Sequence, residues 1–138
     1  MTVAQDVLDE IMASLTPVGS TTDTTLARPV EFAADTLYGW PLTEAFVPEG
    51  TGEWDDARFT LRLAWAADAS EEVASMTRDR DTSLAIGGVV DAIQAWVLAN
   101  RTGTAYEQLQ VIAVDWDSLI THELRGAYVD LAGYQLLS

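Results

Sequence analysis

The sequence predicts an α+β domain in which helices cover one face of a mostly antiparallel sheet. Two segments, residues 3–15 and 81–100, carry apolar residues at the i, i+3, i+4 spacing of an amphipathic helix. Residues 57–67 alternate apolar and polar side chains, which is the period of a half-buried strand. We therefore expect three to five strands, an N-terminal helix and a long central helix packed on one face, plus an irregular arm.

Length and composition indicate one folded domain over residues 1–138. The chain is 49% hydrophobic, which is typical of a globular protein rather than a disordered one. It contains no cysteine, and this excludes a disulfide framework, a thiolate metal site and thiol catalysis.

Charge is the strongest compositional signal. The chain has 22 acidic and 7 basic residues, a net charge of −15, and every base is an arginine. This balance argues against a basic surface that binds nucleic acid or an anionic membrane. It is compatible with a surface along which a DNA duplex slides without sticking, and equally with a simple contribution to solubility. No signal peptide and no apolar run of about 20 residues is visible, so we expect a soluble protein.

The first helix is expected over residues 3–15, and Pro17 and Gly19, which follow it, are expected to end it. Its apolar stripe consists of Ala4, Val7, Leu8, Ile11, Met12 and Leu15. Acidic residues lie toward its start, where the helix dipole favours them.

Residues 16–56 are predicted to form an extended arm or loop region, with short strands possible at 28–33 and 42–47. All four prolines lie here, and so long an irregular stretch is usually functional. Trp40 and Trp54 within it are costly to leave in water. Either they fold back on the sheet or a partner buries them.

The second helix is the organising element of the chain. Residues 71–78 can continue into residues 81–100 or break before Asp81, a possible cap with Thr82 and Ser83; we favour one long element. Its apolar stripe, which we expect to be buried, consists of Ile86, Val89, Val90, Ile93, Trp96 and Val97. Its other face is smooth because of small residues. That smooth face, made of Gly87, Gly88, Ala92 and Ala95, is predicted to pack against the first helix or a second subunit.

The last two strands are predicted to pair as an antiparallel hairpin, with residues 110–117 opposite 125–136. In the first of them, Leu109, Val111 and Ala113 face one way and Ile112, Val114 and Trp116 the other. Both faces are apolar, so we expect this strand to be buried on much of both faces. Residues 118–123 should form a turn or short connection.

A search for chemistry finds no strong motif. There is no glycine-rich phosphate loop, zinc-ligand spacing or Gly-x-Ser-x-Gly elbow. Asp115, Asp117 and His122 could form an acid–base or cation site, although solvated acids and a connecting histidine explain them more simply. The run Arg78-Asp79-Arg80-Asp81 could meet a charged partner or form a solvated helix start.

Several local strings over residues 59–138 resemble the tail-terminator proteins of long-tailed bacteriophages, also called tail-completion or head–tail joining proteins. They are Phe59–Trp65, Arg78–Ser83, Ala99–Thr102, Val114–Trp116, Arg125-Gly126 and Gly133–Leu136. The resemblance implies a small α+β subunit of a ring, typically a hexamer, with no catalytic residues and no cofactor or metal. Its partners would be further copies of itself, the major tail tube protein and the head–tail connector or stopper protein.

By this resemblance the ring would lie in the virion neck, cap the tail tube, end its polymerisation and let DNA pass through its lumen. The residues that we expect at its protein interfaces are Trp40, Trp54, Arg78, Arg80, Gly87 and Gly88. Two alternatives remain: another neck component, such as a head-completion or connector adaptor protein, and a small ligand-binding or hydrolytic α+β domain.

Overall fold

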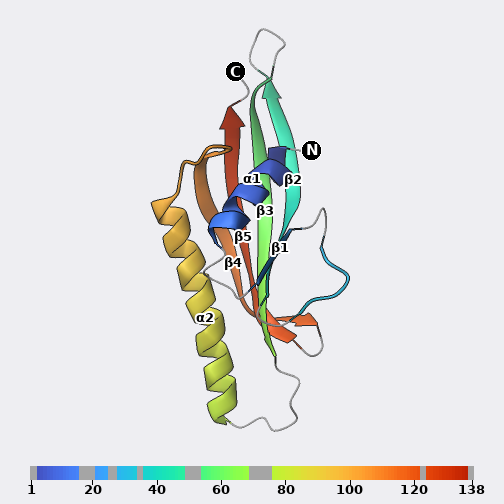
Figure 1. Cartoon of the computed structure of the whole chain (residues 1–138), viewed down its shortest axis with the longest axis vertical. Coiled ribbons are helices and arrows are strands. Elements are labelled where there is room, and N and C mark those ends of the chain that lie inside the picture. The colour runs from blue at the N-terminus through green and yellow to red at the C-terminus, as the bar shows by residue number, and fades with distance from the viewer. Residues whose placement is uncertain are drawn as a thin grey trace.

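Two helices and five strands make up the computed structural model, which describes residues 3–15, 21–24, 28–33, 36–48, 54–68, 76–121 and 124–136. In chain order they are α1 (Val3–Ser14), β1 (Thr21–Thr24), β2 (Thr36–Pro48), β3 (Trp54–Asp68), α2 (Met76–Ala99), β4 (Glu107–Thr121) and β5 (Leu124–Leu136). Figure 1 shows the long strands side by side, with α1 lying across them and α2 along one side. The predicted α+β class, with an N-terminal and a central helix, is confirmed.

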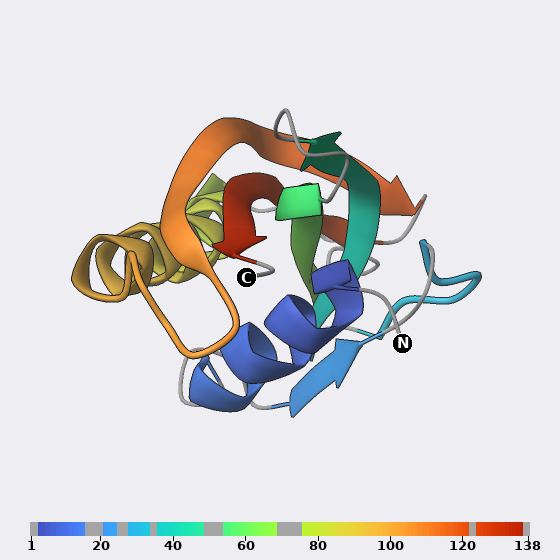
Figure 2. The same ribbon diagram turned by 90° about the horizontal axis from the view of Figure 1, so that it is seen from above.

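The strands form one sheet in the order β1-β2-β3-β5-β4. All neighbouring pairs are antiparallel except β1 and β2, which run parallel over four residues. The predicted hairpin is β4 and β5, and β5 lies between β4 and β3. Seen from above, the sheet curves around its core, with α1 and α2 at separate places on the same face (Figure 2). α1 packs mainly on β1, β2 and β3, and α2 on β3, β4 and β5.

The core lies between the helices and this face of the sheet. The whole predicted stripe of α1 is buried, which confirms the helical period read from the sequence. Alternate residues of β3 meet it, since Phe59, Leu61, Leu63 and Trp65 are all at most 8% exposed. From α2, Ile86, Val90, Ile93 and Val97 complete the same cluster. Burial of these side chains, each worth about 1.5–3 kcal/mol, is the main term that holds the helices on the sheet.

α2 is a single helix of 24 residues, so the preferred prediction of one long element is confirmed from Met76 onward. The prediction that Asp81, Thr82 or Ser83 caps it is wrong, because all three lie inside the helix. Residues 69–75, where the sequence also offers a start, lie outside the described residues. The helix ends as predicted: the side-chain amide of Asn100 donates to the carbonyl of Trp96, and the hydroxyl of Tyr106 donates to the carbonyl of Asn100.

A carboxylate of α1 fixes the loop that follows α2. Glu10 accepts hydrogen bonds from the backbone N–H groups of Thr104 and Ala105, each at 2.7 Å. The phenol of Tyr106 lies beside this contact, and its pKa is raised, first by burial and then by the negative charge of Glu10. The two helices, which lie apart in the fold, are therefore linked through the loop 101–106.

The prediction of a largely irregular arm over residues 16–56 is wrong for most of the described part. β2 spans 13 residues and pairs with β3 along its length, while residues 28–33 are irregular rather than a strand. The positions of the prolines explain how a strand can form where we expected an irregular arm. β1 reaches only as far as Gly39, so Pro41 and Pro48 lie where β2 has β3 alone as a strand neighbour among the described residues. A missing N–H is tolerated at such an edge.

β4 departs from its predicted alternation. Its register with β5 shifts between Val111 and Ala113 and again between Asp115 and Ser118, which are irregularities of the β-bulge type. Val111 and Val114 therefore both pack against the core, whereas Ile112 is 52% and Trp116 50% exposed. The prediction that this strand is buried on much of both faces is wrong. The predicted connection at 118–123 is also shorter, because β4 continues to Thr121.

Candidate protein–protein interface

The outward side of α2 carries large apolar side chains that the chain itself leaves exposed. Leu84 is 62% and Leu98 72% exposed. They lie on one helical stripe, on the side opposite to the buried residues of α2, since positions spaced by four and three residues share a face. The stripe, which we call the outer stripe, consists of Leu84, Gly88, Asp91, Ala95 and Leu98, all exposed.

The outer stripe is also nearly uncharged. Between Leu84 and Asn100 the only ionisable residue is Asp91, in a chain that carries 22 acidic and 7 basic residues among 138. Polar and charged groups normally cover the outward side of a surface helix. Removing water from a neutral helix surface with exposed leucines costs little free energy. Protein-binding surfaces share this property.

α1 does not cover this side of α2 in the described structure. A Cβ atom added at Gly88 would meet nothing within 4 Å, and one added at Gly87 would meet only the ring of Trp116, at 3.6 Å. Of the two predicted packing partners, the first helix is therefore excluded at these glycines, and the second subunit stays a prediction. Figures 1 and 2 show that α2 turns its outward side away from every other described element.

The half-exposed ring of Trp116 extends this apolar surface from α2 onto β4. Trp116 lies on the face of the sheet that α2 covers, as Val114 does two residues earlier. A Cβ atom added at Gly87 would be in ordinary van der Waals contact with this ring, at 3.6 Å. The ring of Trp116 therefore lies next to the Gly87 side of α2.

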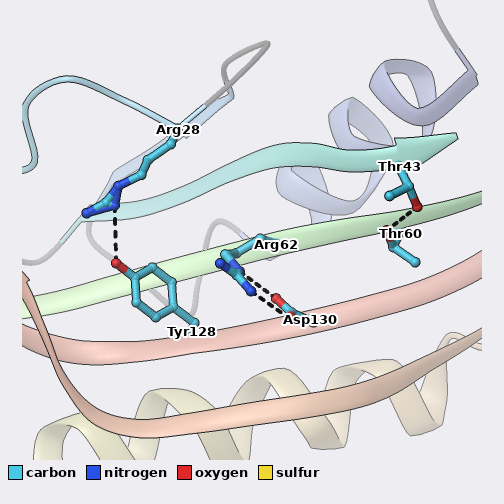
Figure 3. Close-up of polar contacts among 6 residues, drawn as sticks. All are labelled: Arg28, Thr43, Thr60, Arg62, Tyr128 and Asp130. Atoms are coloured by element: carbon cyan, nitrogen blue, oxygen red, sulfur yellow. Dashed lines mark hydrogen bonds and ion pairs between the residues drawn. The ribbon is translucent and has the colours of Figure 1, made fainter.

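The opposite face of the sheet, which neither helix covers, carries a cluster of aromatic and arginine side chains. Trp40 packs edge-on against Phe32 and Tyr128, with ring centroids 6.2 and 6.5 Å apart. The guanidinium of Arg28 lies 4.9 Å from the ring centre of Phe32 and donates to the hydroxyl of Tyr128 (Figure 3). Trp40 is only 3% exposed as a result, so it folds back on the sheet and has little surface left for a partner.

An ion pair fixes the middle of this open face. Arg62 on β3 and Asp130 on β5 are direct cross-strand neighbours, and their side chains form two hydrogen bonds, of 2.8 and 3.0 Å (Figure 3). The hydrogen bonds that Arg62 donates to the carboxylate of Asp130 are the main cause that raises the pKa of Arg62. The guanidinium also lies 5.1 Å from the ring centre of Tyr128. Arg62 is thus committed to contacts within the subunit.

The open face also contains a groove of about 660 Å³, which we call the sheet groove. It lies beyond the Arg62–Asp130 pair, on the side of Arg58 and Tyr134. Ala45 on β2 and Ala132 on β5, the two strands that flank β3, form part of its floor, and Arg58 and Tyr134 lie side by side in register. Arg58 is the only charged residue among the described residues that line it. The lining consists of Thr43, Ala45, Arg58, Phe59, Thr60, Gln108, Gln110, Ala132, Gly133 and Tyr134.

The structure does not gather the six predicted interface residues at one place. Gly87 and Gly88 lie on α2, Arg78 and Arg80 in its first turns, Trp40 on the opposite face of the sheet, and Trp54 at the start of β3. Sequence reasoning missed the exposed Leu84 and Leu98, although their 14-residue separation on the stripe of Gly88 was a usable signal. It also missed Arg58, because nothing in a strand pattern shows where a sheet is hollow.

Of the three residues of the alternative acid–base site, the structure describes the side chain of Asp115 alone. Asp115 is exposed on β4, opposite Tyr128, and the register shifts before Ser118. The regular alternation that predicted Asp115 and Asp117 on one side therefore does not hold. His122 lies outside the described residues. Within the described ranges, no group of three or more His, Cys, Asp or Glu side chains could hold a metal ion.

Two further findings bear on the kind of protein. Of the helices in the described part of the chain, neither has both the length and the apolar composition needed to cross a membrane. No protein-family model and no curated protein matches the sequence. The surface and the sequence patterns therefore carry the functional argument.

Proposed function

We propose that the protein is a structural subunit of a bacteriophage virion. Copies of it form a ring, typically a hexamer, which caps the tail tube, ends its polymerisation and joins the tail to the head connector. The proposal starts from the local strings of residues 59–138 that resemble tail-terminator proteins. The α+β class of the fold is the one that this resemblance implies.

One observation carries the self-associating part of the proposal: the exposed, nearly uncharged outer stripe of α2. Leu84 and Leu98 are more than half exposed on a helix whose opposite side already fills the core. Burying such side chains in a subunit contact recovers apolar free energy that the isolated chain leaves in water. Association of further copies is therefore the simplest role for this side of the molecule.

The net charge of −15 fits a subunit whose ring encloses DNA. Acidic groups along a lumen repel the phosphate backbone, so that a duplex passes without being held. In this proposal the protein has no catalytic role, and DNA is not a specific ligand. The tube protein and the connector or stopper protein are its partners in the neck.

Light scattering coupled to size-exclusion chromatography tests the proposal, with and without tail tubes from the same phage. The expected result is a closed oligomer, either free or bound at tube ends, and tubes that stop growing when it is added. A chain that stays monomeric in both conditions, and never associates with tubes, would contradict the proposal. A ring found elsewhere in the neck of the particle would identify the alternative, a head-completion or connector adaptor protein.

The enzymatic alternative has its own test. Asp115→Ala, Asp117→Ala and His122→Ala are combined in one chain, and assembly and infectivity are measured. Full infectivity is expected, because the proposed role uses none of these side chains. Loss of infectivity with assembly intact would favour a ligand-binding or hydrolytic domain instead.

A further inference from the structure

Arg101, just after α2, is a cation whose side chain has no partner in the described part of the chain. Its guanidinium is exposed and forms no hydrogen bond or ion pair there. The other arginines whose side chains the structure describes all have contacts within the chain, and these are Arg28, Arg58, Arg62 and Arg125. Because 22 acidic residues face 7 bases, most positive charges are expected to find a partner within the chain. Arg101 is therefore available to another molecule.

Arg101 lines a cleft of about 390 Å³ between the C-terminal end of α2 and the first residues of β4, which we call the Arg101 cleft. This volume lies in the range of about 300–1,000 Å³ that is usual for ligand sites. Apart from the guanidinium, its polar side chains are the amides of Gln94 and Gln110. Its apolar lining comes from both elements and consists of Val97, Leu98, Leu109 and Val111.

The backbone that carries Arg101 is held in place against β4. Its carbonyl accepts a hydrogen bond from the N–H of Leu109, at 2.7 Å. The loop that follows is closed by the N–H of Gly103, which donates to the carbonyl of Tyr106, and by the two bonds that Glu10 accepts. A ligand therefore meets a frame that is already formed, which lowers the entropy cost of binding.

The end of a helix carries a partial negative charge, which by itself disfavours an anion. At the end of α2, several of the carbonyl groups in question already accept hydrogen bonds, and these belong to Trp96, Val97, Asn100 and Arg101. The unit charge of the Arg101 guanidinium also exceeds the helix-end charge of about half a unit. The cleft therefore favours an anionic group over a cationic one.

We propose that the Arg101 cleft binds a segment of a partner protein in which one carboxylate adjoins an aliphatic side chain. The guanidinium binds the carboxylate through two parallel hydrogen bonds. The aliphatic side chain packs on Leu109 and Val111, and the amides of Gln94 and Gln110 bind the backbone of the segment. Because the chain has a net charge of −15, the partner is a neutral or basic protein in which this carboxylate is isolated. The inference goes beyond the proposed function and does not depend on it.

Two other occupants fit the cleft less well. A nucleic-acid backbone carries many phosphates, and one guanidinium cannot offset their repulsion by this acidic chain. A second copy of the chain would bring a further net charge of −15 to a site with a single cation. A neutral or basic partner protein meets neither obstacle.

Two peptides that differ in one group test the role of the carboxylate. They are acetyl-Lys-Leu-Asp-Leu-Lys-amide and the same peptide with Asn in place of Asp. Each is added to the isotope-labelled protein, and the backbone amide signals are followed by NMR. The Asp peptide should shift the signals of Arg101, Leu109, Gln110 and Val111 until they saturate.

The Asn peptide should bind at least about tenfold more weakly, because it lacks the charged acceptor. Its greater positive charge would by itself favour non-specific binding to this acidic chain, so the two effects have opposite signs. Equal dissociation constants for the two peptides, or shifts that map to another part of the protein, would overturn the proposal.

Arg101→Gln removes the cation from the cleft. The fold should be kept, because the guanidinium has no contact within the described residues, and urea unfolding checks this. The dissociation constant of the Asp peptide should rise at least about tenfold. Arg101→Lys, which keeps the charge but not the planar fork, should give a value between the two. The matched control is Arg58→Gln, which removes the same charge from an exposed position on the open face of the sheet and should leave the constant unchanged. Wild-type affinity in Arg101→Gln would contradict the assignment.

Two further measurements distinguish the occupants. N-acetyl-leucine offers a carboxylate and an aliphatic side chain without a peptide segment, and it should bind more weakly than the Asp peptide. Equal binding would assign the cleft to a small organic acid. Sedimentation velocity of Arg101→Gln should show the same self-association as wild type, whereas weaker self-association would place a second copy in the cleft. Either result would overturn the assignment to a partner protein.

The outcomes also separate this site from the proposed function. A protein that binds the Asp peptide but stays monomeric, with and without tail tubes, keeps the Arg101 cleft and loses the proposed ring. A protein that forms rings but does not bind the Asp peptide keeps the ring and loses this site.

Discussion

Gly126 and Gly88 show how differently two glycines can be constrained in the same chain. A Cβ atom at Gly126 would overlap the backbone carbonyl oxygen of Trp65, in the central strand β3. Backbone atoms in the middle of a sheet cannot move aside without breaking the ladder. At Gly88, by contrast, the added carbon meets no other atom within 4 Å.

We therefore expect opposite effects of the same substitution at these positions. Gly126→Ala should lower the free energy of unfolding by at least about 3 kcal/mol, because it forces β5 away from β3. Gly88→Ala should raise it by about 0.5–1 kcal/mol, because alanine restricts the unfolded chain and favours the helix. Urea unfolding at low protein concentration measures both. A Gly126→Ala chain as stable as wild type would contradict the close approach of these strands.

Tyr106 should make the free energy of unfolding depend on pH in the alkaline range. Its pKa is raised above the ordinary value near 10 by burial and then by Glu10. The folded state therefore holds this proton more tightly than the unfolded state. This contribution is complete below the unfolded pKa and is lost as pH rises through the folded pKa.

The prediction for Tyr106 is a fall in the free energy of unfolding above about pH 10. Tyr106→Phe should start from a lower stability, since it loses the hydrogen bond to the carbonyl of Asn100, but should decline less over that pH range. Urea unfolding at pH 8 and at pH 10.5 gives the comparison. Identical declines in the two proteins would show that the phenol is not responsible.

Among the elements, the link between α1 and the loop after α2 depends on one side chain. Glu10→Ala removes the acceptor of two backbone N–H groups and should cost about 1–3 kcal/mol of unfolding free energy. Amide hydrogen exchange at Thr104 and Ala105 should accelerate at the same time. Glu10→Gln, which keeps one carbonyl acceptor, should give an intermediate result.

Asp9→Ala is the matched control for Glu10, because Asp9 is the neighbouring acid on α1 and is exposed. It removes the same charge without removing the acceptor. If Asp9→Ala accelerated exchange in the loop as much as Glu10→Ala, the effect would be one of general charge and not of this contact.

The sequence predicts most reliably those elements whose periodicity is uninterrupted. The core-facing sides of α1, β3 and α2 follow their expected patterns, since apolar residues at a fixed spacing mark a buried face. On β3 the other face is also partly covered, because Ala64 and Ala66 are buried there. The start of α2 is not predictable in this way. Asp81, Thr82 and Ser83 prefer the N-cap position of a helix, but this preference is weaker than the packing of the helix on the sheet. β2 could not be predicted from the sequence alone. Its prolines are compatible with pairing to β3 only where β2 has no strand on its other side, and the sequence does not show where that edge lies.

The side-chain directions of β4 and the location of the candidate interface could not be predicted for a related reason. A bulge inserts one residue into a strand, which reverses the apparent face of every later side chain, and no local pattern marks the insertion at Ile112 or near Trp116. The outer stripe could be predicted as a stripe, but not as exposed. Only the fold shows that α1 packs elsewhere and leaves Leu84 and Leu98 uncovered.

For the whole molecule, the net charge should influence how the proposed subunits associate. Two chains of charge −15 repel at a distance, and salt screens this repulsion over a Debye length of about 10 Å at 0.1 M. A contact between nearly uncharged surfaces loses little when salt is added. Self-association should therefore tighten as sodium chloride is raised from low to moderate concentration, as measured by sedimentation velocity. Weakening with salt would indicate a contact dominated by ion pairs.

If this chain is a ring-forming subunit of the phage neck, as we propose, its mass in solution will show it. Light scattering over a range of concentrations, alone and with tail tubes, should give one closed oligomer whose mass is a fixed multiple of 15.0 kDa, with a lower proportion of oligomer for Leu98→Glu. A mass of 15.0 kDa at every concentration, with and without tubes, would contradict it.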